Sequence, residues 1–564
     1  MGDLRSSWLG NAWLTWNSKE LTALRQEFDA YCVSIEALSN VSETESAKKV
    51  LRDLVEAALV RLVSIKTAMR AHESMNPQSS GLISVRTEIG KKAAFLTSLW
   101  RRLTQAESGE SFASCASGEA SCDSSLASDL IPTLSSIHRH IFSAFLIQAH
   151  NQYGQAQQLS YSQTLQILKS SDDSALRKSA WLASNVWCSQ NRLLFMDLLN
   201  LTLAVKANSR CSPESLMQRA FREESIQPQT YLSMFQALED AKVDARQSVT
   251  LRAKAQHQAK LPAFELFSVV PSQASRQDFG NYESTLRQIT QSYAELDSDF
   301  VKFIDDIQKN QWVDARLHSK KVGGTWCENY PATKQVVIFA NFSSGLAAAV
   351  QLAHPFAVGY LHYLHNHHGS FRPSTPYSVL ETAAEVGMEQ LLKFYAHQRS
   401  VDEKELLWYQ LRSLSNKLLW LPMRHHLMKE LLNHRINGPL GIAEISKCVK
   451  ECWQHWFGDS VDGIDPYYWA LKPHFFRTDV LYYDWQYTMG FLLGKKIVAT
   501  LFESSPLQRG PLLQKFFVSL SRQSIETAAK DIFEWDLESV DFWHEAIAES
   551  LEPLGRFQSI WNLH

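Results

Sequence analysis

Side chains that could carry chemistry are concentrated in two segments of this sequence. They are imidazole, carboxyl and phenol groups: His354, Glu381 and Glu385 in the first segment, and His474, Tyr483 and Tyr487 in the second. Imidazoles and carboxylates bind metal ions and transfer protons, and phenol groups donate hydrogen bonds. The two segments therefore predict a site with acid/base, metal or hydrogen-bonding chemistry.

The first segment follows a short stretch with β-strand character. Lys321–Tyr330 and Lys334–Phe342 are rich in β-formers and are separated by a proline-containing turn, which predicts a hairpin. A helix carrying His354 is expected directly after the hairpin, with Ser343 or Ser344 as its N-cap. Glu381 and Glu385 belong to a further helix, which is expected to begin near Ser378.

The order of these features resembles the oligoendopeptidase F branch of the thimet-oligopeptidase-type zinc metallopeptidase family. In that family a glycine-rich hairpin precedes a helix with H-E-x-x-H, a downstream E-T/S-A-S-type helix supplies the third zinc ligand, and a His-Phe segment with spaced tyrosines follows. The counterparts here are Gly323-Gly324-Thr325, His354, Glu381-Thr382-Ala383-Ala384, Pro473-His474-Phe475 and Tyr482–Gly490. The resemblance covers roughly residues 150–500 in motif order.

The sequence departs from the family at two positions of the metal-binding helix. Pro355 stands where the family has the water-activating Glu, and Val358 stands where it has the second His. The resemblance therefore leaves two metal-ligand positions, His354 and Glu381, whereas a catalytic zinc ion needs three protein ligands. A proline inside a helix also costs about 3 kcal/mol. No zinc and no other cofactor is expected.

The remaining candidates of the two segments each have two interpretations. The resemblance implies that Tyr483 or Tyr487, together with His474, points at the scissile position; otherwise the tyrosine-rich segment, with Tyr482 and Trp485, supplies core aromatics. Glu385 lies one turn after Glu381. It either joins His354 and Glu381 in an oxygen-rich metal site, or it supports a metal ligand by a hydrogen bond or forms an ion pair.

Three other groups of residues offer weaker hypotheses. They contain imidazoles and thiols that are close in sequence: His362, His365, His367 and His368; Cys448, Cys452 and His455; and Cys327 alone. The first group is interpreted as a helix C-terminus that favours imidazolium, rather than as a relocated metal site. The second is interpreted as buried thiols rather than as metal ligands. Cys327 would be a nucleophile only if a histidine were paired with it.

Composition excludes several classes of protein. The 564 residues carry a net charge of −3, which gives no support for a nucleic-acid or anionic membrane partner. Eight scattered cysteines are typical of reduced thiols in the cytoplasm. No run of 18 apolar residues is present, so no membrane span is expected. With only 22 Gly and 17 Pro, the chain is expected to be mainly α-helical.

Two parts are expected along the chain. Residues 1–130 are predicted to form an N-terminal helical lobe, with a linker at Glu107–Ser128, and residues 131–564 an oligopeptidase-like domain that is helical from Leu130 to about Ala259. The resemblance implies a zincin-like oligopeptidase architecture. Two helical lobes would then surround a deep cleft, with one small hairpin sheet beside the site helix.

The sequence leads to one principal hypothesis about function and two alternatives. The principal hypothesis is a catalytically degenerate oligoendopeptidase-like protein that binds a peptide or peptide-like ligand, or acts with a protein partner, without zinc-dependent hydrolysis. The first alternative is an enzyme that uses the retained groups for new chemistry on a peptide or amino-acid-derived metabolite. The second is a residual metallopeptidase with a nonstandard metal site.

Overall fold

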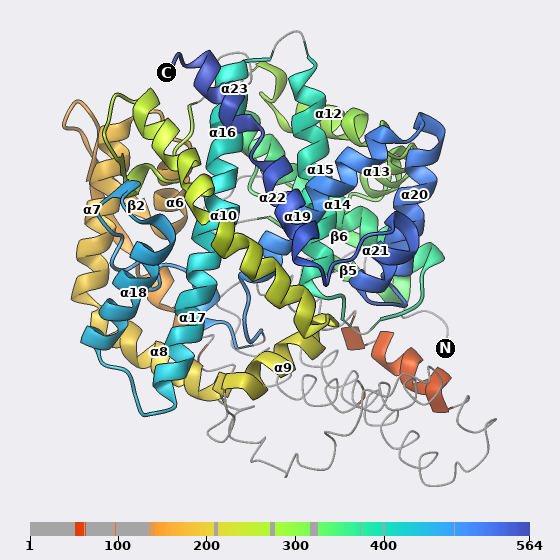
Figure 1. Ribbon diagram of the computed structural model, residues 1–564, viewed down its shortest axis with the longest axis horizontal. Helices are drawn as coiled ribbons and strands as arrows, with labels where there is room; N and C mark the ends of the chain where they lie inside the picture. The colour runs from red at the N-terminus through yellow and green to blue at the C-terminus, as the bar shows by residue number, and fades with distance from the viewer. Residues whose placement is uncertain are drawn as a thin grey trace.

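The computed structural model describes residues 51–60, 62–63, 96, 134, 137–138, 140–207, 213–270, 277–315, 325–372, 374–398, 401–478 and 480–563 (Figure 1). These parts of the chain are mainly helical, as predicted. Most of the predicted N-terminal lobe and all of the predicted linker lie outside the described residues. The described residues 51–60 are helical and bury Leu51, Val55 and Ala58.

Long helices alternate with very short strands along the rest of the chain. The elements are β1 (Leu146–His150), β2 (Ala156–Ser160), α6 (Tyr161–Ser170), α7 (Ser174–Gln190), α8 (Arg192–Ala207), α9 (Pro213–Glu224), α10 (Pro228–Ala255), β3 (Leu261–Pro262), η1 (Ala263–Glu265), α12 (Tyr282–Ala294), α13 (Asp299–Lys309), β4 (Val313–Asp314), β5 (Trp326–Tyr330), η2 (Pro331–Thr333), β6 (Gln335–Phe339), α14 (Leu346–His368), α15 (Tyr377–Ala396), α16 (Glu403–Ser415), η3 (Asn416–Trp420), α17 (Leu421–Arg435), α18 (Ile442–Phe457), β7 (Val461–Asp462), η4 (Pro473–Phe476), α19 (Trp485–Glu503), α20 (Pro506–Ser519), α21 (Ile525–Phe533), α22 (Val540–Ser550) and α23 (Pro553–Ile560). Among the described helices, none has the length and apolar character that a membrane span requires.

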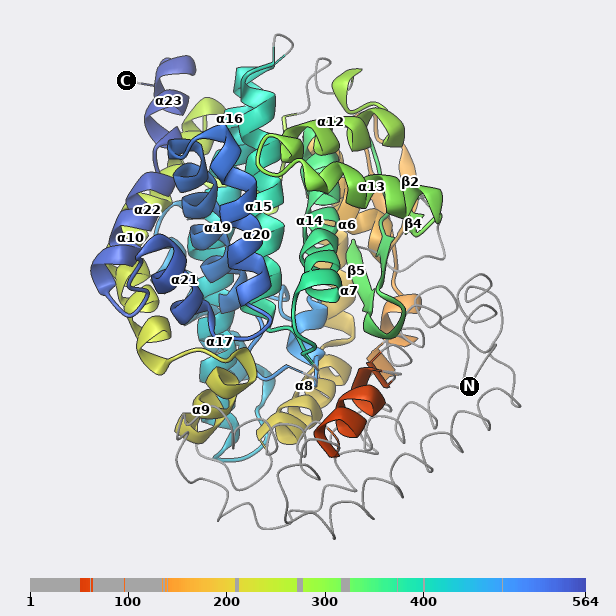
Figure 2. The same ribbon diagram turned by 90° about the vertical axis from the view of Figure 1, so that its right-hand side faces the viewer.

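Helices α14, α15 and α19 form the centre of the molecule, with α15 between the other two (Figure 2). Glycines allow these helices to approach one another closely. A Cβ atom on Gly387 of α15 would lie 2.5 Å from the Cβ of Ala357 on α14. A Cβ on Gly490 of α19 would lie 2.6 Å from the backbone carbon of Glu381. The close contacts place the chemistry-bearing faces of the three helices next to one another.

The predicted hairpin before the site helix is confirmed. Strands β5 and β6 are antiparallel, with Cys327 opposite Ile338, and β4 pairs with β6 in parallel to complete a three-stranded sheet. The reversal of the chain uses η2 and then Lys334 at φ 56°. The sheet packs on α14, where Gly359 lies against Val336 and Ile338. It therefore covers one side of the helix that carries His354.

A second hairpin contradicts the prediction of continuous helix from Leu130 to about Ala259. Strands β1 and β2 pair along their whole length, from Leu146 opposite Ser160 to His150 opposite Ala156. Their sequences, LIQAH and AQQLS, have few β-branched residues, so local propensity gives little signal for a strand. The hairpin forms because it buries Ile147, with Ala149 and Leu159, against α7.

The N-cap of the site helix lies one or two residues later than the sequence predicts. Neither Ser343 nor Ser344 is its N-cap; the cap is Gly345, whose φ of 94° is accessible mainly to glycine. The Gly345 N–H donates to the carbonyl of Phe279 at 3.0 Å. Tertiary contact with the preceding segment therefore sets the start of α14. Helix α15 begins at Tyr377, in agreement with the start predicted near Ser378.

Helix α14 runs without interruption through Pro355, which is buried. Because proline has no N–H, the carbonyl four residues earlier, that of Gln351, lacks its helical donor. The hydroxyl of Thr325 donates to this carbonyl at 3.4 Å, from the residue directly before β5. The hairpin thus supplies a hydrogen bond that the proline removes.

The histidines at the end of α14 differ from the predicted imidazolium cluster. His362 and His365 are buried, and burial lowers the pKa of His362 to about 3 and the pKa of His365 to about 4. Both are therefore neutral at physiological pH, and His365 Nε2 lies 2.7 Å from the carbonyl oxygen of Phe517. His367 and His368 are exposed. Within the described residues, no metal-ligand group forms around these histidines.

We predict that acid weakens the fold through His362 and His365. Their pKa values are lowered in the folded state, so below pH about 6.5 the unfolded chain binds protons that the folded chain does not. The free energy of unfolding should fall by about 2 kcal/mol per histidine between pH 7 and pH 5. Urea unfolding of His365→Gln should show a smaller fall than the parent, whereas His367→Gln, at an exposed position, should match it. An identical pH dependence for parent and His365→Gln would contradict this assignment.

Candidate functional site

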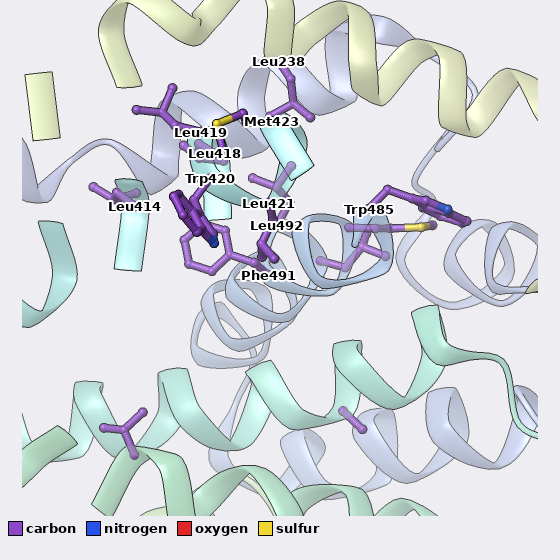
Figure 3. Packing of buried hydrophobic residues seen from close by; sticks show 14 of the residues in the cluster. Leu238, Leu414, Leu418, Leu419, Trp420, Leu421, Met423, Trp485, Phe491 and Leu492 are labelled. Carbon is purple, nitrogen blue, oxygen red and sulfur yellow. The ribbon is translucent and has the colours of Figure 1, made fainter. Parts of the chain in front are cut away.

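A buried lysine that sequence analysis did not single out lies at the centre of the candidate site. Lys417 belongs to η3, a π-helical turn between α16 and α17, and its side chain is 10% exposed. Its Nζ contacts Oε1 of Glu385 on α15. The rings of Tyr487 and Phe491 on α19 lie 5.6 Å and 5.9 Å from its Nζ. Leu418 and Trp420 of the same stretch belong to the buried apolar core, as does Phe491 (Figure 3). The ammonium group is therefore held in an apolar wall by one carboxylate.

Glu381 lies one turn before Glu385 on the same helix and also faces Lys417. It is 4% exposed, and burial raises the pKa of Glu381 to about 8, with a further rise from Glu224 and an opposing effect from Lys417. Glu381 therefore carries a proton at neutral pH. Its Oε2 is buried and has no hydrogen-bond partner in the protein. A polar atom left unpaired in this way is available to a ligand.

His354 approaches the same lysine from α14. Burial, together with the charge of Lys417, lowers the pKa of His354 to about 4. The imidazole is therefore neutral at physiological pH. Burial also lowers the pKa of Lys417 to about 8, while Glu381 opposes this shift. The structure thus brings together His354, Glu381 and Glu385 and places them around an ammonium group.

The tyrosine-rich segment contributes to the site with two residues and to the core with two others. Tyr487 lies beside the Glu381 carboxyl and acts to lower its pKa, and its hydroxyl lies 2.8 Å from that of Tyr483. Tyr483 in turn stacks on the His474 ring at 4.9 Å between centroids, with an angle of 17°. In contrast, Tyr482 and Trp485 are fully buried core aromatics. The core interpretation is therefore confirmed for Tyr482 and Trp485, whereas Tyr483 and Tyr487 lie beside Glu381.

Three further residues, Arg477, Tyr377 and Glu224, lie next to these tyrosines and Glu381. Arg477 donates to the Tyr377 hydroxyl at 2.8 Å, and its guanidinium lies 4.4 Å from the centre of the Tyr483 ring. Glu224 accepts from the Ser378 N–H at 2.9 Å, at the start of α15. Sequence analysis missed all three. For Lys417 a signal exists, because it is the charged residue directly before the apolar run Leu418–Leu421.

The donor groups do not fit a zinc ion. Val358, at the second histidine position, is buried and has no donor atom, and Pro355 has no carboxylate. Glu385 is ion-paired with Lys417, which confirms the ion-pair interpretation of this residue and leaves the oxygen-rich metal site without one of its ligands. In the part of the chain that the structure describes, no three His, Cys, Asp or Glu side chains are grouped as metal ligands.

The other sequence candidates lie apart from this chemistry. Burial raises the pKa of the Cys327 thiol well above its ordinary value, which disfavours the nucleophilic thiolate. Cys448 and Cys452 are buried free thiols, as predicted. His455 instead turns to α10, where its Nε2 lies 2.8 Å from Oε1 of Glu239.

Comparison with known proteins identifies the fold. No family model matches the chain, and no curated protein matches it in sequence. Oligoendopeptidase F from Enterococcus faecium superposes with a TM-score of 0.63 at 10% identity, covering 96% of this chain and 99% of the other. PZ peptidase A gives 0.70 at 12%, covering 96% and 98%. A Chlamydophila abortus protein assigned as a peptidase gives 0.67 at 16%, covering 96% and 98%. The predicted oligoendopeptidase F fold, mainly helical and zincin-like, is confirmed.

We predict that Lys417→Met destabilises the protein by about 3–5 kcal/mol, because it leaves Glu385 buried without its cation. Lys495→Met is the matched control. It removes a lysine that pairs at 2.8 Å with Glu389, one turn further along α15, and that pair is more exposed. The control should lose about 1 kcal/mol or less. Adding Glu385→Gln to Lys417→Met should recover part of the loss. Equal losses in the two single variants, measured by urea unfolding, would contradict the special role of Lys417.

Proposed function

We propose that this protein binds a peptide or peptide-like ligand at the Lys417 site and does not hydrolyse it with zinc. The observation that carries the proposal is the contact between the Lys417 ammonium and Glu385, beside Glu381 and His354. A tethered cation there takes the place that a metal ion would need among these side chains. The absence of donor groups at Pro355 and Val358 points in the same direction.

Electrostatics supports exclusion of a divalent ion. Two unit positive charges about 4 Å apart repel by about 4 kcal/mol at an effective dielectric constant of about 20. A dication at Glu385 would meet this repulsion for each of its charges unless Lys417 moved or lost its proton. With one neutral imidazole and one protonated carboxyl as the remaining donors, coordination offers little compensation.

The groups that remain suit recognition of a peptide. His354, the protonated Glu381 and Tyr487 offer neutral donors and acceptors, which match the N–H and C=O groups of an amide backbone. Strand β5 lies at the edge of the sheet ordered β4-β6-β5, next to the site helix. An extended peptide can add to such an edge by backbone hydrogen bonds without any metal ion.

We predict that the purified protein contains far less than one equivalent of zinc and shows no chelator-sensitive cleavage of quenched fluorescent peptides. Metal analysis by mass spectrometry and a peptide cleavage assay with and without EDTA measure these two properties. Peptide binding is measured separately, by fluorescence anisotropy. Stoichiometric zinc together with EDTA-sensitive cleavage would disprove the proposal.

We also predict that Lys417 prevents rebuilding of a zinc site. The double variant Pro355→Glu/Val358→His supplies the two missing groups on α14. It should bind zinc more tightly, by about tenfold or more, when Lys417→Met is added, because the competing cation is then absent. Adding Lys495→Met instead serves as the control and should leave zinc affinity unchanged. If the double variant alone binds zinc as tightly as the triple variant, Lys417 does not compete for the site.

A second candidate function is non-hydrolytic catalysis on a peptide or an amino-acid-derived metabolite. The observation that favours it is the pair of buried groups, Glu381 and Lys417, whose pKa values of about 8 allow proton transfer near neutral pH. Mass spectrometry of ligands incubated with the protein distinguishes the two functions. A product that forms with the parent and disappears in Glu381→Gln favours catalysis, whereas unchanged ligand favours binding alone.

A further inference from the structure

Three positively charged side chains from separate elements lie near one another, and two of them, Lys169 and Lys472, also lie near His474. They are Lys169 at the end of α6, Arg412 on α16 and Lys472 directly before η4, which together are named the Lys169 cluster. Arg412 lies close enough to lower the pKa of Lys169, and Lys169 likewise contributes to lowering the pKa of Lys472 to about 7. Like charges in one place repel each other, so the fold maintains this arrangement at a cost.

Local contacts fix the cluster around Phe267. Arg412 donates to the carbonyl of Phe267 at 3.2 Å, and Lys472 Nζ lies 5.6 Å from the centre of the Phe267 ring. The hydroxyl of Tyr161 on α6 donates to the carbonyl of Leu471, which ties the helix of Lys169 to the segment of Lys472. The convergence is therefore built into the packing of three elements.

The cluster lacks direct neutralisation by the protein. Asp484, which lies near Lys472, is ion-paired with Arg424 at 2.7 Å. Asp465 and Asp484 raise the pKa of Lys472 only against a larger lowering by burial and by its cationic neighbours. Within the described part of the chain, no carboxylate forms an ion pair with any member of the Lys169 cluster. This contrasts with Lys417, which is paired with Glu385.

Two independent observations indicate that a ligand completes this arrangement. Lys169 is exposed to solvent, so a ligand can reach it, although desolvation by the protein and the charge of Arg412 lower its pKa. In addition, Nδ1 of His474 is buried without a hydrogen-bond partner, and Lys169 and Lys472 are among the cations that lower the pKa of His474. His474 leads through Tyr483 and Tyr487 to Glu381.

We propose that the Lys169 cluster binds a carboxylate group of the ligand whose backbone lies at the Lys417 site. This inference rests on the proposed function and narrows it to anionic peptides or peptide-like molecules. Two lysines and an arginine provide charge-assisted hydrogen bonds to a carboxylate, and the ligand charge relieves the repulsion among them. The carboxylate comes either from the C-terminus of the ligand or from an acidic side chain.

The test compares matched sets of short fluorescein-labelled peptides of the same sequence by fluorescence anisotropy. One form has a free C-terminal carboxylate, one is amidated, and one is amidated but contains an internal Glu. The carboxylate should bind about tenfold or more tightly than the amide. If the internal Glu restores the affinity, the side chain is a sufficient source of the charge; if it does not, the C-terminus is the source. Either result supports the inference.

Variants test whether the Lys169 cluster causes the difference in affinity between the carboxylate and amidated peptides. Lys169→Gln and Lys472→Gln should each lower the affinity for the carboxylate peptide about tenfold and leave that for the amidated peptide unchanged. Lys178→Gln, at an exposed position on α7, removes the same charge and should change neither. If the parent protein binds the carboxylate peptide and the amidated peptide with equal affinity, the inference is overturned and the proposed function still stands. This comparison does not depend on whether a variant folds. Failure of every peptide to bind overturns the proposed function itself.

Discussion

The Lys417 ammonium contacts Glu385 inside a wall of leucine and aromatic side chains, where an unpaired charge would be very costly. The free-energy cost of removing two charges from water is offset only when the two partners are in close contact. That contact requires η3 to direct the Lys417 side chain toward Glu385 on α15. π-Helical turns inside helices are frequent at functional sites. The pairing of one lysine with one glutamate therefore fixes the relation between two helices that are close in space.

The same constraint determines what the neighbouring groups can do. Glu381 lies one turn from Glu385 and shares its apolar surroundings, but the lysine is already paired, so burial keeps Glu381 protonated at neutral pH. His354 is kept neutral for a related reason. The site is therefore a set of neutral hydrogen-bonding groups around a tethered monocation. The hydroxyls of Tyr487 and Tyr483 extend this set toward His474.

Much of the local architecture could be predicted from sequence. The β5–β6 hairpin, the helix after it and the start of α15 follow from β-formers, turn residues and helical periodicity. The grouping of His354 with Glu381 followed from motif order. Hairpin β1–β2 was missed because its stability comes from packing on α7 rather than from strand propensity. His362 and His365 were assigned to a charged helix end, since their burial depends on elements such as α20 that are far away in sequence.

The sequence alone determined that the metal-binding pattern is incomplete, because Pro355 and Val358 have no side-chain atoms able to activate water or bind zinc. It also determined the helical fold class, through a periodicity that is local along the chain. Only the tertiary structure decided which charge lies among the remaining carboxyls. Lys417 is separated from Glu385 by 32 positions, and the apolar run that follows Lys417 indicates burial but does not identify its partner. Contacts between segments remote in the chain depend on packing, and packing also converts ordinary carboxyl and imidazole groups into the neutral groups of this site.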